Sequence, residues 1–164
     1  MDNSAVVSIT TGPLTLSATC VREMMTGVPN APIDGLKNFN MGHPGGTDPW
    51  LLAATSDSYS VGMIGSYVMG NLYGDRSDIE FVNTFEGHAD YYEGDDATGD
   101  VLEQWLGSER HNVVAAHFSG PDKVGHKWGT VSEEYRNKML DLDQKLSGWS
   151  VSYTHLTLPT MELV

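Results

Sequence analysis

An aspartate and a histidine four residues apart, Asp122 and His126, are the strongest candidates for chemistry in the sequence. They lie in SGPDKVGHKWG, which follows directly on the apolar run NVVAAHF. A carboxylate and an imidazole are ligands that zinc and manganese accept, and one turn of backbone can aim both at one ion. The glycines around them, Gly125 and Gly129, allow a close backbone approach. Because the pattern is short, an exposed acidic loop that happens to contain a histidine is the alternative.

Hydroxyl side chains gather at the start of a predicted helix in PLTLSATCVREMMTG, at Thr15, Ser17 and Thr19. Backbone N–H groups and the dipole at a helix N-terminus favour an anion, either a phosphate or an ionised hydroxyl. The alternative is that Thr15 or Ser17 is only the N-cap of the helix. Cys20, the single cysteine, lies on the same helix and is expected to be a small buried apolar side chain rather than a nucleophile.

The charge balance restricts the partners. Nine Lys and Arg against 22 Asp and Glu give a formal net charge of −13 over 164 residues. Nucleic-acid binding needs clustered basic side chains, so this class of partner is excluded. A phosphorylated substrate would be repelled at long range, and bound cations would have to supply the counter-charge. No apolar run approaches the roughly 20 residues that a membrane-spanning helix needs.

Apolar periodicity predicts alternating strands and helices. Short apolar runs between polar or glycine-rich segments predict strands at 59–67, 78–85 and 112–118. Helical periodicity and capping signals predict helices at 15–27, 49–56, 95–106 and 130–149. This alternation predicts an α/β fold with a mostly parallel sheet sandwiched by helices. Ligands of such sheets bind beyond the carboxyl ends of the strands, where the loop that carries Asp122 is expected to begin.

The last predicted helix has both a start signal and an apolar stripe. Thr130 and Glu133 have the spacing of a capping box. Apolar residues then step by three or four, which predicts a buried face formed by Val131, Tyr135, Met139, Leu142, Leu146 and Trp149.

Two segments together resemble the alkaline phosphatase superfamily, most nearly its branch of type I phosphodiesterases and glycosylphosphatidylinositol ethanolamine-phosphate transferases. In that branch a Pro-x-Thr precedes a short helix ending in Thr-Gly, followed by a Pro-containing loop and an Asn-Phe. The chain has these features in order, at Pro13, Thr15, Thr26-Gly27, Pro32-Ile33-Asp34 and Asn38-Phe39. The segment AAHFSGPDKVGHKWG is similar to the family's H-x-x-G-x-D-x-x-G-H signature, with matches at His117, Gly120, Asp122, Gly125 and His126. The resemblance covers nearly all of residues 10–149.

The resemblance implies that residues 1–150 are an incomplete alkaline phosphatase-like catalytic domain. Thr15 would be the nucleophile and a metal contact, and Asp122 and His126 would be ligands of one of two divalent metal ions, zinc or manganese. The full-length protein would transfer a phosphoryl or phosphoethanolamine group, or hydrolyse a phosphodiester, through a covalent phosphothreonine-type intermediate. Its substrate would be a phosphate ester or a phospholipid head group. In the transferase branch this domain faces the lumen of the endoplasmic reticulum, and membrane contact is expected only through helices absent from this sequence.

Parts of the family pattern are missing. The upstream strand ending in an Asp-Ala-x-Arg run is not found in residues 1–14, and the downstream Asp-His-Gly and later His are not found before residue 150. Residues 151–164 are interpreted as a non-native tail, because VSYTHLTLPT matches the translation of a transposon-derived adapter used in sequencing libraries. The chain is therefore expected to be an internal fragment that is inactive by itself.

Several interpretations stay open from the sequence. A soluble phosphatase or phosphodiesterase of the same superfamily is the near alternative. A hypothesis of another class is a non-catalytic binding module in which Asp122 and His126 only brace a loop. His117 is either functional or a satisfied strand-end residue, and His43 and His88 are expected to be solvent-exposed loop residues.

Overall fold

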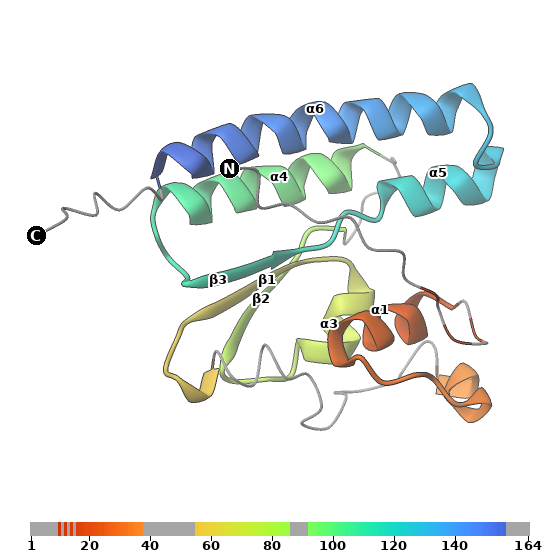
Figure 1. The fold of residues 1–164 in the computed structure, drawn as a ribbon, viewed down its shortest axis with the longest axis horizontal. Helices are drawn as coiled ribbons and strands as arrows, with labels where there is room; N and C mark the ends of the chain where they lie inside the picture. Colours follow the sequence, from red (N-terminus) through yellow and green to blue (C-terminus); the bar gives the residue numbers. More distant parts are fainter. Residues whose placement is uncertain are drawn as a thin grey trace, which may run out of the picture.

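The structure, a computed structural model, describes residues 16–37, 55–85 and 92–156, together with residues 10, 12 and 14, with side chains as far as residue 149. Within these residues, one small parallel sheet carries helices on both faces (Figure 1). The predicted α/β class with a parallel sheet is therefore confirmed. No helix in the described ranges is long and apolar enough to cross a membrane.

The sheet has three strands in the order β2-β1-β3, with β1 (Val61–Gly65) between β2 (Ile79–Asn83) and β3 (Val113–Ala116). Both pairings are parallel, and Val61 of β1 is in register with Ile79 and Val113. Every residue of β1 is buried, which explains its uninterrupted apolar sequence VGMIG. The predicted strands are all present, each shorter than expected.

On one face of the sheet, α1 (Ser17–Thr26) and α3 (Tyr67–Tyr73) cover the strands (Figure 1). Side chains from both helices and from β1 and β2 form the main apolar core, made of Ala18, Val21, Met25, Val61, Met63, Val68, Met69, Leu72, Tyr73 and Ile79. Between α1 and the next strand lies a 3-10 helix, η1 (Pro32–Lys37). The prediction of a helix at 49–56 falls mostly outside the described residues.

On the other face lie α4 (Glu93–Gly107), α5 (Gly120–Trp128) and α6 (Glu133–Leu156). A Cβ on Gly62 of β1 would lie 2.4 Å from the ring of Trp105 and 2.5 Å from that of His111. Only glycine therefore lets α4 pack directly on the central strand.

The segment predicted to be a loop after β3 is the helix α5, so this prediction was wrong. Pro121 lies in its first turn, where the ring is tolerated, and Gly129 ends it with a φ of 83°. Asp122 and His126 are therefore separated by one turn of regular helix.

The start and the buried face of α6 also differ from the prediction. The backbone N–H of Tyr135 donates to Ser132 Oγ at 3.1 Å, so Ser132, rather than Thr130, supports the helix start. Of the predicted apolar stripe, Tyr135, Leu142 and Trp149 are half-buried, whereas Val131 is 99% exposed and Met139 and Leu146 are also exposed, so the prediction of the inward face is only partly right. The helix continues to Leu156, inside the predicted tail of residues 151–164. Backbone conformation says nothing of the tail's origin, which stays a prediction.

Candidate functional site

Asp122 and His126 form a polar pair on the surface of α5. Asp122 Oδ1 lies 3.5 Å from His126 Nε2, and the two side chains are 60% and 80% exposed. The pair borders a shallow depression of about 250 Å³, lined by Pro121, Asp122, Gly125, His126, Thr130 and Tyr135. Both side chains are therefore accessible from solvent and close enough to reach one ion.

The local sequence places this pair at the carboxyl end of the sheet. β3 ends at Ala116, and α5 begins four residues later, at Gly120. Asp122 lies in the first turn of α5 and His126 in the last, where the helix dipole favours a negative and a positive side chain respectively. A Cβ on Gly125 would lie 3.3 Å from the ring of Tyr135, so glycine lets α5 pack closely against α6.

His117 directly follows β3 and precedes the helix that carries the pair. A Cβ added to Gly65 would lie 2.9 Å from the Cβ of His117, so His117 lies beside the end of β1. Burial lowers the pKa of His117, and the negative charges of Asp95 and Asp122 oppose this shift in part. His117 Nδ1 is buried with no hydrogen-bond partner among the described residues, which favours the functional interpretation over a satisfied strand-end histidine.

Thr15, the predicted nucleophile, lies outside the described residues, so its role stays a prediction. Its neighbour Leu16 is the N-cap of α1, and Ser17 is the first helical residue, so the interpretation of Ser17 as the cap was wrong. Thr19 Oγ1 donates to the carbonyl oxygen of Leu16 at 2.7 Å. The hydroxyl of Thr19 is thus engaged with the backbone at the helix start rather than directed to a ligand.

Glu23 connects the segments on either side of α1. Its Oε1 accepts the backbone N–H of Asn30 at 2.8 Å, and its Oε2 accepts that of Gly12 at 3.1 Å. These two hydrogen bonds, first that of Asn30, hold the pKa of Glu23 below its ordinary value. The carboxylate therefore fixes residue 12, three positions before Thr15, against the helix.

The other predicted candidates do not join this site. Cys20 is half-buried, and its Sγ lies 3.6 Å from the carbonyl oxygen of Leu14, which agrees with a packing role. His43 and His88 lie outside the described residues.

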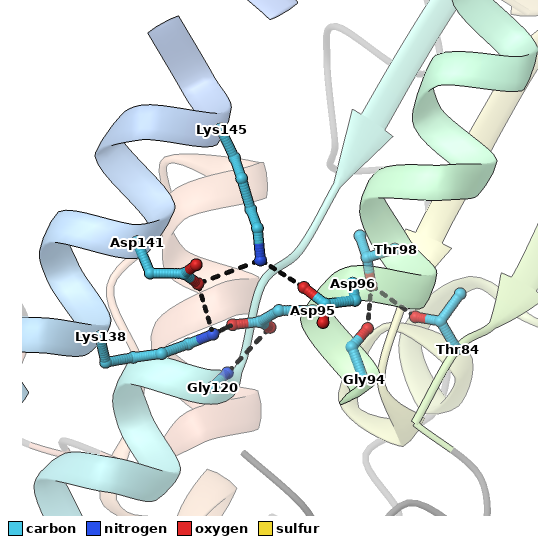
Figure 2. A network of polar contacts seen from close by, with 9 residues as sticks. All are labelled: Thr84, Gly94, Asp95, Asp96, Thr98, Gly120, Lys138, Asp141 and Lys145. Carbon is cyan, nitrogen blue, oxygen red and sulfur yellow. Dashed lines mark hydrogen bonds and ion pairs between the residues drawn. The ribbon is translucent and has the colours of Figure 1, made fainter. Parts of the chain in front are cut away.

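A buried charge pair next to the site was missed by sequence reasoning. Asp95 in the first turn of α4 and Lys138 of α6 are both 0% exposed, and Asp95 Oδ2 lies 2.8 Å from Lys138 Nζ. Figure 2 shows this pair beside a group of three side chains, in which Lys145 lies between Asp96 and Asp141. No pattern within α6 indicates this pair, because the partner of Lys138 lies 43 residues away in sequence.

Asp122 and His126 can form part of a metal site. A carboxylate oxygen and an imidazole nitrogen suit zinc or manganese, and their helical spacing lets them share one ion. Within the described ranges, no group of three or more His, Cys, Asp or Glu side chains is arranged to hold a metal ion. Asp122 and His126 can therefore supply two ligands, and further ligands would have to come from elsewhere in the protein.

Comparisons of the chain with protein-family models, with curated proteins and with solved structures find no match. The interpretation of the site therefore depends on its own residues and on the two motif segments.

Proposed function

We propose that the full-length protein catalyses metal-dependent transfer of a phosphoryl or phosphoethanolamine group, or hydrolysis of a phosphodiester, with Thr15 as nucleophile. The observation that carries this proposal is the accessible Asp122–His126 pair, 3.5 Å apart on a helix that begins where a parallel strand ends. In α/β proteins, substrates bind beyond the carboxyl ends of the parallel strands. The finer assignment, an alkaline phosphatase-like domain, belongs to the same proposal and rests on the motif segments.

The acidity of the chain supports a metal-dependent reaction. With 22 acidic side chains against nine basic ones, the protein offers little positive charge to a phosphate ester. Divalent ions, one of them bound by Asp122 and His126, would neutralise the phosphate oxygens and favour ionisation of the attacking hydroxyl.

In the proposed first step, Thr15 Oγ forms a bond to phosphorus and the bond from phosphorus to the leaving oxygen breaks. The hydroxyl proton passes to solvent and the leaving oxygen takes one up. Water or an acceptor hydroxyl then forms the new bond to phosphorus, and the bond to Thr15 Oγ breaks. The side chain of Thr15 is restored, so the protein is chemically unchanged after one turnover.

This proposal is tested by trapping the covalent intermediate. The zinc-loaded full-length protein is mixed with an aryl phosphodiester, or with vesicles containing phosphatidylethanolamine, quenched in acid, and measured by intact mass. We expect a phosphoryl-type adduct that disappears in Thr15→Val, which keeps the shape of the side chain and removes the hydroxyl. Ser17→Ala is the matched control and should retain the adduct. An adduct of equal yield in Thr15→Val would exclude the assigned nucleophile.

A non-catalytic module is the second candidate, favoured by the direct contact between Asp122 and His126. A carboxylate–imidazole pair at i and i+4 can brace a helix without any ion. Full-length protein that binds neither zinc nor manganese at this pair, and forms no adduct, would support the module.

A further inference from the structure

A single buried carboxylate connects three helices next to the candidate site. Asp95 Oδ1 accepts the backbone N–H of Gly120, the first residue of α5, at 3.0 Å. Its other oxygen, Oδ2, lies 2.8 Å from Lys138 Nζ on α6. Figure 2 shows Asp95 between these two groups. Asp95 itself belongs to α4, so residues 25 and 43 positions away in sequence meet at its side chain.

Asp95 performs the task of an N-cap for α5 from a different helix. The local candidate is Ser119, whose Oγ is buried and has no hydrogen-bond partner in the part of the chain that the structure describes. An acceptor at a helix N-terminus satisfies a backbone N–H that has no intrahelical partner, and a negative charge there favours the helix dipole. The carboxylate therefore fixes both the position and the direction of the first turn of α5.

Lys138 explains why a carboxylate can occupy this position. A charged carboxylate with no exposed surface is costly unless it is paired. Lys138 supplies the opposite charge, and its ammonium also lies 3.3 Å from Asp141 Oδ2 and 4.2 Å from the centre of the Tyr92 ring. The lysine thus neutralises Asp95, and the other carboxylate oxygen stays available to the N–H of Gly120.

The direction of α5 decides where the candidate ligands point. Gly120 is two residues before Asp122, and one short helix carries both Asp122 and His126. A rotation at the first turn would move the two side chains together. Their 3.5 Å separation would stay the same, but their orientation relative to metal ligands from other segments would change.

We propose that Asp95 is a positioning residue of the metal site, which sets the aim of Asp122 and His126 by accepting the N–H of Gly120. This inference rests on the proposed function. Residues that orient metal ligands without touching the ion typically change metal affinity by about 10- to 100-fold when they are replaced. A purely structural role for the Asp95–Lys138 pair would affect folding and leave the affinity of folded protein unchanged.

The test compares two double variants of the full-length protein, one with and one without a side-chain acceptor for the N–H of Gly120. Asp95→Asn with Lys138→Met removes both charges and keeps an amide oxygen that can accept the N–H. Asp95→Ala with Lys138→Met removes the charges and the acceptor. The zinc affinity of each is measured by calorimetric titration with Zn²⁺ alone, on protein shown to be folded by circular dichroism. Asp96→Ala, which removes the neighbouring partly exposed carboxylate of α4, is the matched control.

We expect the Asn double variant and Asp96→Ala to retain the wild-type affinity, and the Ala double variant to lose about 10- to 100-fold. Exchange of the Gly120 amide hydrogen, followed by NMR, should be faster in the Ala double variant alone. Equal zinc affinity in the two double variants would overturn the inference.

The failure of the proposed function would look different. If wild-type protein bound no zinc at Asp122 and His126, that function would fail, and the amide exchange would then decide only the claim that Asp95 holds the first turn of α5. Unchanged protection of Gly120 in the Ala double variant would overturn the claim, and faster exchange would support it. An Ala double variant that does not fold, beside an Asn double variant that does, would assign the acceptor a structural role and would overturn the positioning claim.

Discussion

Replacement of Asp95 by Asn should destabilise the protein much more than the same replacement of its neighbour Asp96. In the wild type the ammonium of Lys138 has no exposed surface and lies 2.8 Å from the carboxylate of Asp95. Asn has nearly the same shape as Asp but no charge. Asp95→Asn therefore leaves a buried ammonium without its nearest counter-charge, whereas Asp96→Asn affects a pair that water already screens.

The magnitude follows from what remains around Lys138. Breaking a buried ion pair by removing one partner costs about 3–5 kcal/mol of unfolding free energy. Asp141 Oδ2 stays 3.3 Å from the ammonium and the Tyr92 ring stays in place, so we expect the lower end, about 3 kcal/mol. The pair of Asp96 and Lys145 is 54% and 29% exposed, and its loss should cost less than about 1 kcal/mol.

The assay is urea unfolding followed by circular dichroism. With a denaturant slope of about 1–3 kcal/mol per molar urea, Asp95→Asn should lower the midpoint by about 1–3 M. Adding Lys138→Met to Asp95→Asn should recover most of this loss, because the double variant contains no unpaired buried charge. The reasoning would be refuted if Asp95→Asn and Asp96→Asn had equal effects, or if the second substitution recovered nothing.

Further predictions concern packing and pH. Gly62→Ala should lower the free energy of unfolding by about 1–3 kcal/mol, measured by thermal unfolding, because its Cβ would lie 2.4 Å from the Trp105 ring. Gly107→Ala is the control and should leave this free energy unchanged, because a Cβ at this end of α4 would have nothing within 4 Å. Burial holds the pKa of His117 below 6.5 in the folded protein, so as pH falls the unfolded chain takes up a proton on this imidazole before the folded chain does. The free energy of unfolding should therefore decrease as pH drops below about 6.5, by at most about 1.4 kcal/mol per pH unit. His117→Gln should flatten this part of the pH–stability curve, and an unchanged curve would contradict the burial of a neutral imidazole.

The strands were predictable because each is a short apolar run between polar or glycine-rich segments. β1 is the clearest case, since its burial on both faces requires apolar side chains throughout. The same rule failed just after it. The sequence YSVGMIGSYVMGNLY is apolar across both β1 and α3, so periodicity gave no sign of the change from strand to helix at Ser66.

The helix that carries the candidate site was missed because its local propensity is poor. α5 contains a proline and two glycines, which usually indicate a loop. Tertiary contacts decide its conformation instead: Asp95 accepts the first N–H, and Gly125 lets the helix approach Tyr135. Neither contact can be inferred from residues 119–129 alone.

The inward face of α6 was predicted only in part for a related reason. An apolar stripe was expected, yet Lys138 on the inward face is fully buried while Val131 and Met139 are exposed. The acidic first turn of α4 lies opposite, and its Asp95 and Asp96 pair with Lys138 and Lys145, so charge pairing adds to the packing of Tyr135 and Trp149 on the inward side of α6. Such pairing depends on a partner more than 40 residues away, which periodicity within one helix cannot reveal.

The most direct test of the central claim is a calorimetric titration of metal-free full-length protein with Zn²⁺, compared with the variant that combines Asp122→Asn and His126→Gln. Both side chains are exposed, so the variant should fold as the wild type does. The proposed two-metal site predicts that the variant binds one zinc ion fewer per chain and no longer forms the covalent adduct at Thr15. Equal zinc stoichiometry and equal adduct in the two proteins would contradict it.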